Sequence, residues 1–87
     1  MKIITTKKFL KDLKRQEKRS KNLDKLQKIV GQLASNSKLP ELHREHLLKG
    51  EFRDFYECHI EPDWLLIYKK QKDTLYLARA GTHSDLF

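Results

Sequence analysis

The chain has 87 residues, of which 38% are hydrophobic and 36% charged, and its formal net charge is +7. One modest hydrophobic core is feasible at this length, and the apolar residues form short periodic runs, which argues against a disordered tail. No apolar run is long enough for a signal sequence or a membrane span, and the lone cysteine, Cys58, has no disulfide partner within the chain. We therefore expect a single cytoplasmic domain, residues 1–87, without membrane contact.

The positive charge lies almost entirely in the first third of the chain. Residues 1–30 hold eleven Lys or Arg and three acidic residues, whereas residues 31–87 hold eight and nine. All four histidines lie in the nearly neutral remainder: His43, His46, His59 and His83. This separation indicates one part that binds a polyanion and another that carries out chemistry. The charge alone leaves open that the lysines only make the helices soluble.

The first third has the pattern of a short strand followed by two helices. Residues 2–5 predict an edge strand, and Thr6 is a plausible N-cap for a helix with a thin apolar stripe. Ser20 or Asn22 is expected to cap the second helix. Its apolar residues recur at the spacing of a buried helical face: Leu23, Leu26, Ile29, Val30 and Leu33.

The rest of the chain predicts three strands. Residues 41–50 are expected to form a loop or a short helical turn, and from Phe52 the apolar residues alternate with polar ones. Phe52, Tyr56, Cys58 and Ile60 are assigned to one face of this strand, and Arg53, Glu57 and His59 to the other. Residues 64–68 are apolar on both faces, as in a covered central strand, and a final strand over 75–80 ends at Gly81.

These elements predict an α+β fold in which a short N-terminal strand and an α-helical hairpin pack on an antiparallel sheet. Short turns make neighbouring strands antiparallel, so the face that carries Arg53, Glu57 and His59 should lie near Arg79. Acid, base and cation are then expected in one place. Cys58 falls at an apolar position, and we interpret it as buried filler.

The histidines suggest RNA cleavage by acid–base chemistry. Such cleavage needs a base for the ribose 2′-hydroxyl, an acid for the departing 5′-oxygen and cations around the phosphate. Imidazole can take either proton role near neutral pH, and Arg79 or Arg53 could hold the phosphate oxygens. Glu57 and Asp63 could act as base or orient an imidazole.

Each histidine also has an interpretation without a catalytic role. His43 alone is expected to be non-functional, and His59 beside Glu57 could simply be ion-paired. A metal site at His43 and His46 is disfavoured because the chain has one cysteine and no second ligand pair at tight spacing. The three glycines are not grouped, so no nucleotide cofactor is expected, and Ser84 with Asp85 lacks the setting of a Ser-His-Asp hydrolase.

Three segments carry a resemblance to a known family. They are His46-Leu47-Leu48-Lys49-Gly50, the run from Glu57 to Tyr68 (ECHIEPDWLLIY), and the run from Arg79 to Phe87 (RAGTHSDLF). With them the chain resembles, over most of its length, the YafQ branch of the RelE-like toxins. The H-x-E-P-D-W-x-L-I-Y run and the G-T-H-x-x-L-F ending are specific.

The resemblance implies a helix hairpin on an antiparallel sheet and ribosome-dependent cleavage of messenger RNA. It also implies inhibition by a cognate acidic antitoxin, and contact with operator DNA only through the antitoxin complex. Carried over residue by residue, the catalytic set is His46, His59, Asp63 and His83, supported by Glu57 and Phe87. An aspartate often stands in the family where this chain has Glu57. Arg79 fits a phosphate-contact position, Phe87 would position a substrate base, and neither metal nor cofactor is implied.

Two other function classes remain open from the residues alone. A non-catalytic nucleic-acid-binding module would explain the basic helices but not the four histidines, and would slow translation without cutting the message. A protein-interaction module that binds an acidic peptide would leave translation unaffected.

Overall fold

The structure is a computed structural model that describes residues 1–87. In chain order the elements are β1 (Lys2–Thr5), α1 (Lys7–Lys18), α2 (Leu23–Ala34), the 3-10 turn η1 (Glu41–His43), β2 (His46–Leu47), the 3-10 turn η2 (Gly50–Phe52), β3 (Tyr56–Glu61), β4 (Trp64–Gln71), β5 (Thr74–Gly81) and α3 (His83–Leu86). None of the helices is long and apolar enough to cross a membrane.

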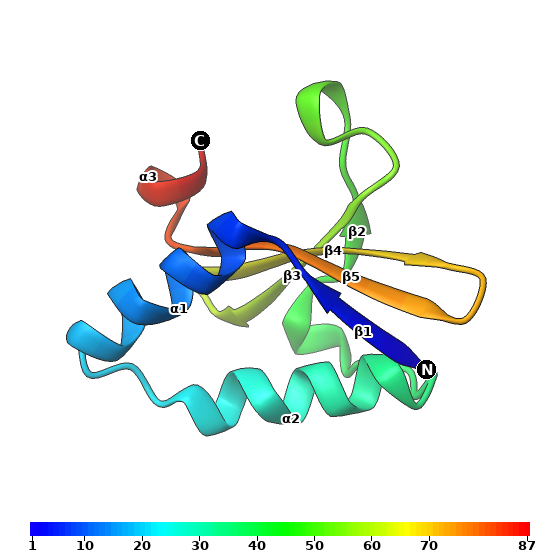
Figure 1. Cartoon of the computed structure of the whole chain (residues 1–87), viewed down its shortest axis with the longest axis horizontal. Coiled ribbons are helices and arrows are strands. Elements are labelled where there is room, and N and C mark those ends of the chain that lie inside the picture. The colour runs from blue at the N-terminus through cyan, green and yellow to red at the C-terminus, as the bar shows by residue number, and fades with distance from the viewer.

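The strands form one five-stranded sheet in the order β1-β5-β4-β3-β2. The predicted α+β fold, with a helical hairpin and a meander of three antiparallel strands, is confirmed. The sheet is mixed, however, because β1 runs parallel to β5 at one edge. At the other edge the two-residue strand β2 pairs with β3. Strand β2 lies within residues 41–50, which were expected to form a loop or a short helical turn. Figure 1 shows α2 along one face of the sheet, with α3 and the η2 loop on the opposite side.

Both helix starts follow from side-chain caps. The Thr6 side chain accepts a hydrogen bond from the Phe9 backbone N–H at 3.0 Å, as expected for an N-cap. Of the two candidates for the second helix, Asn22 is the cap, because its side chain accepts from the Asp24 N–H at 3.0 Å. Ser20 instead has a φ of 59° in the turn between the helices.

The central strand β4 is covered on both faces, as its sequence predicted. On the α2 side, Trp64, Leu66 and Tyr68 are at most 1% exposed and belong to the main core with the apolar face of α2. On the opposite side, Leu65 and Ile67 are fully buried in a smaller cluster with Ala78 and Leu86. The second cluster therefore forms the floor beneath the face that carries the histidines.

The assignment of Phe52 was wrong. Phe52 lies in η2 and packs against the cluster of Leu65 and Ile67, on the face opposite Cys58 and Ile60. Asp54 has a φ of 75° and β3 begins only at Tyr56. The alternation of side chains between the two faces of the sheet therefore starts at Tyr56 and does not extend back to Phe52. Arg53, which follows η2, is likewise outside the strand and does not share a row with Glu57 and His59.

Helix α1 completes the sheet beyond the end of β1. The Thr6 hydroxyl donates to the Ala78 carbonyl at 2.7 Å, and the Gln16 amide donates to the Ala80 carbonyl at 2.6 Å. The Asp12 carboxylate accepts from the Ala80 N–H at 3.1 Å. These side chains form hydrogen bonds with backbone groups of β5 that have no partner in a neighbouring strand. The edge of β5 is therefore covered without another strand.

Candidate active site

Glu57 lies at the centre of the histidine cluster. Its register partner on β4 is Ile67, whose partner on β5 is Arg79, so the three residues form one row across the sheet. This is the juxtaposition of β3 and β5 that the sequence predicted. Glu57 is only 6% exposed, and a carboxylate this deeply buried requires partners that donate hydrogen bonds.

Two histidines flank the Glu57 carboxylate. Its Oε2 lies 3.1 Å from Nε2 of His46 and 3.6 Å from Nε2 of His59. The other ring nitrogen of His46 faces the Arg44 carbonyl at 2.9 Å, and that of His59 faces the Pro62 carbonyl at 3.2 Å. Every one of these neighbours is a hydrogen-bond acceptor, so both rings are oriented by groups that can accept from an imidazole N–H. The unpredicted strand β2 brings His46 here, because it pairs with Glu57 directly.

His83 is held by Asp63, which lies in the turn between β3 and β4. One carboxylate oxygen of Asp63 accepts from the His83 backbone N–H at 2.9 Å and contacts Nδ1 of the same residue at 2.6 Å. These bonds from His83 lower the pKa of Asp63. With Nδ1 directed at the carboxylate, Nε2 of His83 forms no hydrogen bond within the chain and is left for a substrate.

The three histidines form a continuous series on one side of the sheet. The ring centroids of His46 and His59 are 6.4 Å apart, and those of His59 and His83 are 5.9 Å apart. The side chains of His46 and His83 are about half exposed, whereas that of His59 is 12% exposed. A substrate group above His59 can therefore contact imidazoles on both sides.

Arg79 reaches the same face but is held from behind by Asp12. Its Nε and one terminal nitrogen donate to the two carboxylate oxygens at 2.8 and 3.1 Å, which raises the pKa of the guanidinium. The second terminal nitrogen forms no hydrogen bond within the chain. Arg79 is thus oriented by Asp12 and keeps donors for an anion.

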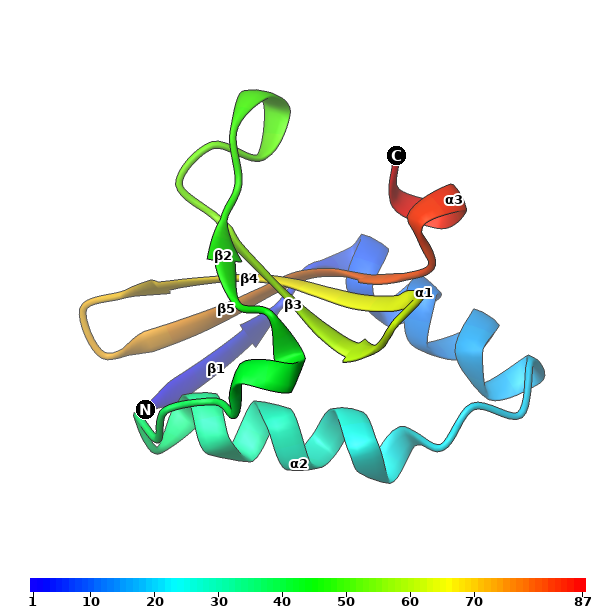
Figure 2. The ribbon, with the colours of Figure 1, turned by 180° about the vertical axis from the view of Figure 1, so that it is seen from behind.

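Phe87 extends beyond α3 into solvent. It is 65% exposed, and its ring meets that of Phe52 edge to face at a centroid distance of 6.0 Å. An exposed aromatic ring with one supporting contact presents a stacking surface. Figure 2 shows the chain end and the η2 loop on the same side of the sheet.

A third set of side chains, not predicted from the sequence, fixes α3. Asp85 closes a capping box with Thr82 and accepts from Arg19 of α1 at 2.7 and 3.1 Å. These partners hold the pKa of Asp85 well below its usual range. Gly81 is required here, because a Cβ at this position would lie 2.9 Å from the Asp85 Cβ. The arrangement sets the position of His83 at the start of α3.

Asp12 and Gln16 were also missed as positioning residues, although a signal was present. They follow Phe9 at spacings of three and seven residues, which places them on the stripe that faces the sheet. Both are 1% exposed. Gln16 additionally accepts from the Trp64 indole N–H at 2.8 Å, so polar groups on this stripe join α1 to β4 and β5.

Two other residues considered from the sequence lie outside the cluster. The Nδ1 atom of His43 is 2.8 Å from the His59 carbonyl oxygen, so its ring contacts the edge of β3 rather than Glu57. Cys58 is fully buried in the core, and burial raises the pKa of its thiol to about 12. The interpretation of Cys58 as buried filler is confirmed.

Comparison with known proteins gives this geometry a context. The chain is 39% identical over 80 residues to the mRNA interferase toxin YafQ of Escherichia coli strain K12, covering 91% of this chain and 87% of that protein. It superposes with a TM-score of 0.91 on YafQ in the E. coli DinJ–YafQ complex, at 37% identity and 98% and 96% coverage of this chain and that one.

A metal-bound toxin from Helicobacter pylori superposes with a TM-score of 0.93 at 46% identity, covering 100% of this chain and 99% of that one. In this chain no group of three or more His, Cys, Asp and Glu side chains is arranged to hold a metal ion.

The family match extends over the whole chain. Residues 1–87 match the family described as the bacterial toxin of type II toxin–antitoxin systems, YafQ. Together with the identity to the E. coli toxin and the shared fold, this match shows that the chain belongs to the YafQ family of type II toxins.

Proposed function

We propose that this toxin is a ribosome-dependent mRNA endoribonuclease, an mRNA interferase, that arrests translation by acid–base cleavage of a phosphodiester bond. The observation that carries the proposal is the series His46, His59 and His83, in which carboxylates and carbonyls orient every ring. The name of the E. coli relative supports the same activity.

His83 is proposed as the general base. Asp63 holds Nδ1–H, and Nε2 faces outward as a proton acceptor. Nε2 takes the proton from the ribose 2′-hydroxyl, and the 2′-oxygen then attacks the adjacent phosphorus.

The acid comes from the pair of histidines beside Glu57. His46 and His59 share one buried carboxylate and both face acceptors, so either ring can hold the proton that the leaving oxygen needs. One of them protonates the 5′-oxygen as the P–O bond breaks. The products are a 2′,3′-cyclic phosphate, or the 3′-phosphate formed from it by water, and a free 5′-hydroxyl.

Three further residues are proposed to hold the RNA. Arg79 contacts the phosphate oxygens with its unpaired terminal nitrogen, and its charge stabilises the transition state. Phe87 stacks on a substrate base. Arg53, which stands on the η2 loop away from the cluster, contacts the message outside the cleft.

The partners follow from charge and from the family. The lysines and arginines of α1 and α2 dock on ribosomal RNA, and this binding weakens as salt is added. An acidic antitoxin neutralises the toxin, as the DinJ–YafQ complex of E. coli suggests. Operator DNA is contacted only through that complex, and the toxin acts in the cytoplasm.

The test is translation of a defined message by purified components, followed by mapping of new message ends. Wild type should produce discrete cuts with cyclic or 3′-phosphate ends, and His83→Ala should produce none while still binding antitoxin. Ser84→Ala, one residue further along α3, is the matched control and should cut normally. Slowed translation of an intact message by wild type would overturn the proposal, as would full cutting by His83→Ala.

A further inference from the structure

A groove leads from the histidine cluster around the edge of the sheet to α2. Its first part is a cavity of about 420 Å³ next to His59, and its second is a cavity of about 320 Å³ against α2. The two cavities share three lining residues, Lys25, Leu42 and Ile60, so they form one continuous surface.

The groove exists because β3 lacks a strand neighbour beyond Glu57. Strand β2 pairs only with Tyr56 and Glu57. The next part of the edge is covered by η1, which His43 attaches through its bond to the His59 carbonyl. The chain around η1 therefore forms a wall opposite α2, with the edge of β3 as the floor between them.

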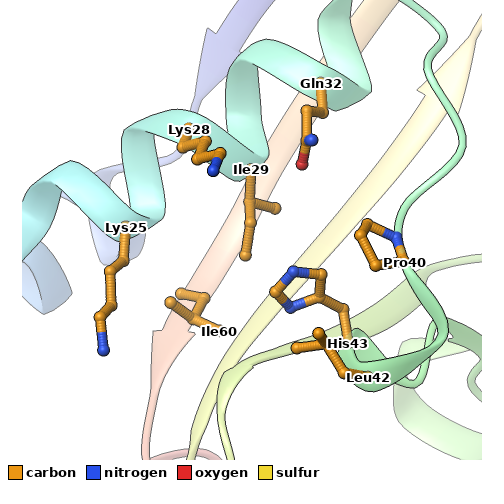
Figure 3. Close-up of a pocket in the computed structure, with 8 residues that line it drawn as sticks. All are labelled: Lys25, Lys28, Ile29, Gln32, Pro40, Leu42, His43 and Ile60. Carbon is orange, nitrogen blue, oxygen red and sulfur yellow. The ribbon is translucent and has the colours of Figure 1, made fainter.

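The wall and the floor each present apolar side chains to the groove. Figure 3 shows Ile29 of α2, Ile60 of β3 and the ring of His43 pointing toward one another across the second cavity. Leu42 lines both cavities and is 72% exposed. A flat ring could lie between these side chains and cover them from water.

The rim is positive. Lys25 is engaged by Glu61, whose carboxylate is 2.7 Å from its Nζ and also contacts Lys21. Lys28 and Arg44, on opposite sides of the groove, form no ion pair within the chain. Two free cations above an apolar floor match single-stranded nucleic acid, whose bases stack on apolar surfaces while its phosphates contact cations.

We propose that this groove binds the stretch of message next to the cut, with one base between the wall formed by Leu42 and His43 and the facing side chain of Ile29, and with the backbone against Lys28 and Arg44. The proposal rests on the proposed function, because it places the scissile phosphate at His59, where the groove begins. The groove then sets which nucleotide stands beside the cut, and Leu42, Lys28 and Arg44 contribute to binding rather than to proton transfer.

The first experiment measures cleavage against the concentration of ribosomes programmed with a defined message. Leu42→Ser combined with Lys28→Gln should raise the half-saturating concentration about fivefold or more and change the rate at saturation less than about twofold. Leu10→Ser combined with Lys11→Gln is the matched control, because it also removes one exposed leucine and one lysine of the helices that are proposed to dock on ribosomal RNA. Leu10 is 49% exposed on α1, Lys11 is exposed beside it, and neither residue lines the groove.

The second experiment does not depend on cleavage. A photoreactive p-benzoylphenylalanine replaces Leu42 or, as control, Leu10, and the message carries a 2′-deoxy nucleotide at the cut so that it stays intact. Crosslinks from position 42, but not from position 10, should map to message nucleotides beside the cut.

The outcomes separate the two proposals. A wild-type protein that leaves the ordinary message intact refutes the proposed function. The groove proposal alone is refuted if the wild-type protein cuts the message but two other results hold. The double variant has an unchanged half-saturating concentration, and crosslinks from position 42 go to ribosomal RNA or to nothing.

Discussion

Removing the Asp12 carboxylate should destabilise the fold, because three hydrogen bonds depend on it. Asp12 is 1% exposed and accepts three hydrogen bonds, two from the Arg79 guanidinium and one from the Ala80 backbone N–H. Replacement by alanine leaves a partly buried guanidinium without its counter-charge and an edge N–H without an acceptor.

The expected cost can be worked from these contacts. Breaking a buried ion pair by deleting one partner costs about 3–5 kcal/mol. The Arg79 side chain is 18% exposed and water can reach part of it, so we expect about 3 kcal/mol for Asp12→Ala and about 1–2 kcal/mol for Asp12→Asn, which keeps one acceptor. A domain of this length is stable by only about 4–13 kcal/mol.

The assay is urea unfolding followed by circular dichroism, with all variants made in the His83→Ala background so that cells tolerate them. Glu17→Ala is the matched control, since Glu17 lies on the same helix, is exposed and forms no ion pair; its effect should stay within about 0.5 kcal/mol. Arg79→Ala completes a double-mutant cycle with Asp12→Ala. A cost below about 1 kcal/mol for Asp12→Ala, or no coupling to Arg79, would refute the reasoning.

Three more outcomes follow from the same contacts. Gly81→Ala should displace α3, because the new Cβ meets the Asp85 Cβ. The variant should be less stable by about 1–3 kcal/mol and should cleave the message more slowly, and unchanged unfolding would contradict this. Asp85 has a folded-state pKa below its unfolded value, so its stabilisation is present above about pH 4 and is lost as the pH falls. Thermal unfolding between pH 6 and pH 3 should accordingly depend less on pH in Asp85→Asn than in wild type. The Cys58 thiol, with its pKa raised to about 12, should react with a thiol reagent only after denaturant is added, and rapid native labelling would show that the core opens.

The sequence was most informative where hydrophobic residues recur at a regular spacing and a capping or turn residue marks the end of the element. The apolar face of α2, the covered strand β4 and the Thr6 cap were all predictable, because each depends on residues close together in the chain. The shared face of Glu57 and His59 was predictable for the same reason. The placement of His46 was not, since a strand of two residues has no period of its own.

Other parts of the site depend on contacts between distant residues. The partner of Asp12 is the backbone of Ala80, and the partner of His83 is a carboxylate twenty residues earlier. No local pattern announces such bonds. The error at Phe52 had a different cause: one residue with positive φ, Asp54, shifted the alternation on which the assignment relied.

The parallel pairing of β1 with β5 has a consequence for biosynthesis. Lys2 to Thr5 are translated well before their partners on β5, Thr74 to Leu77. Helices α1 and α2, which lie between these two strands in the sequence, therefore cannot pack on a complete sheet until β5 has been translated. Because His83 comes later still, a nascent copy cannot assemble a complete cluster of histidines while most of it is being translated.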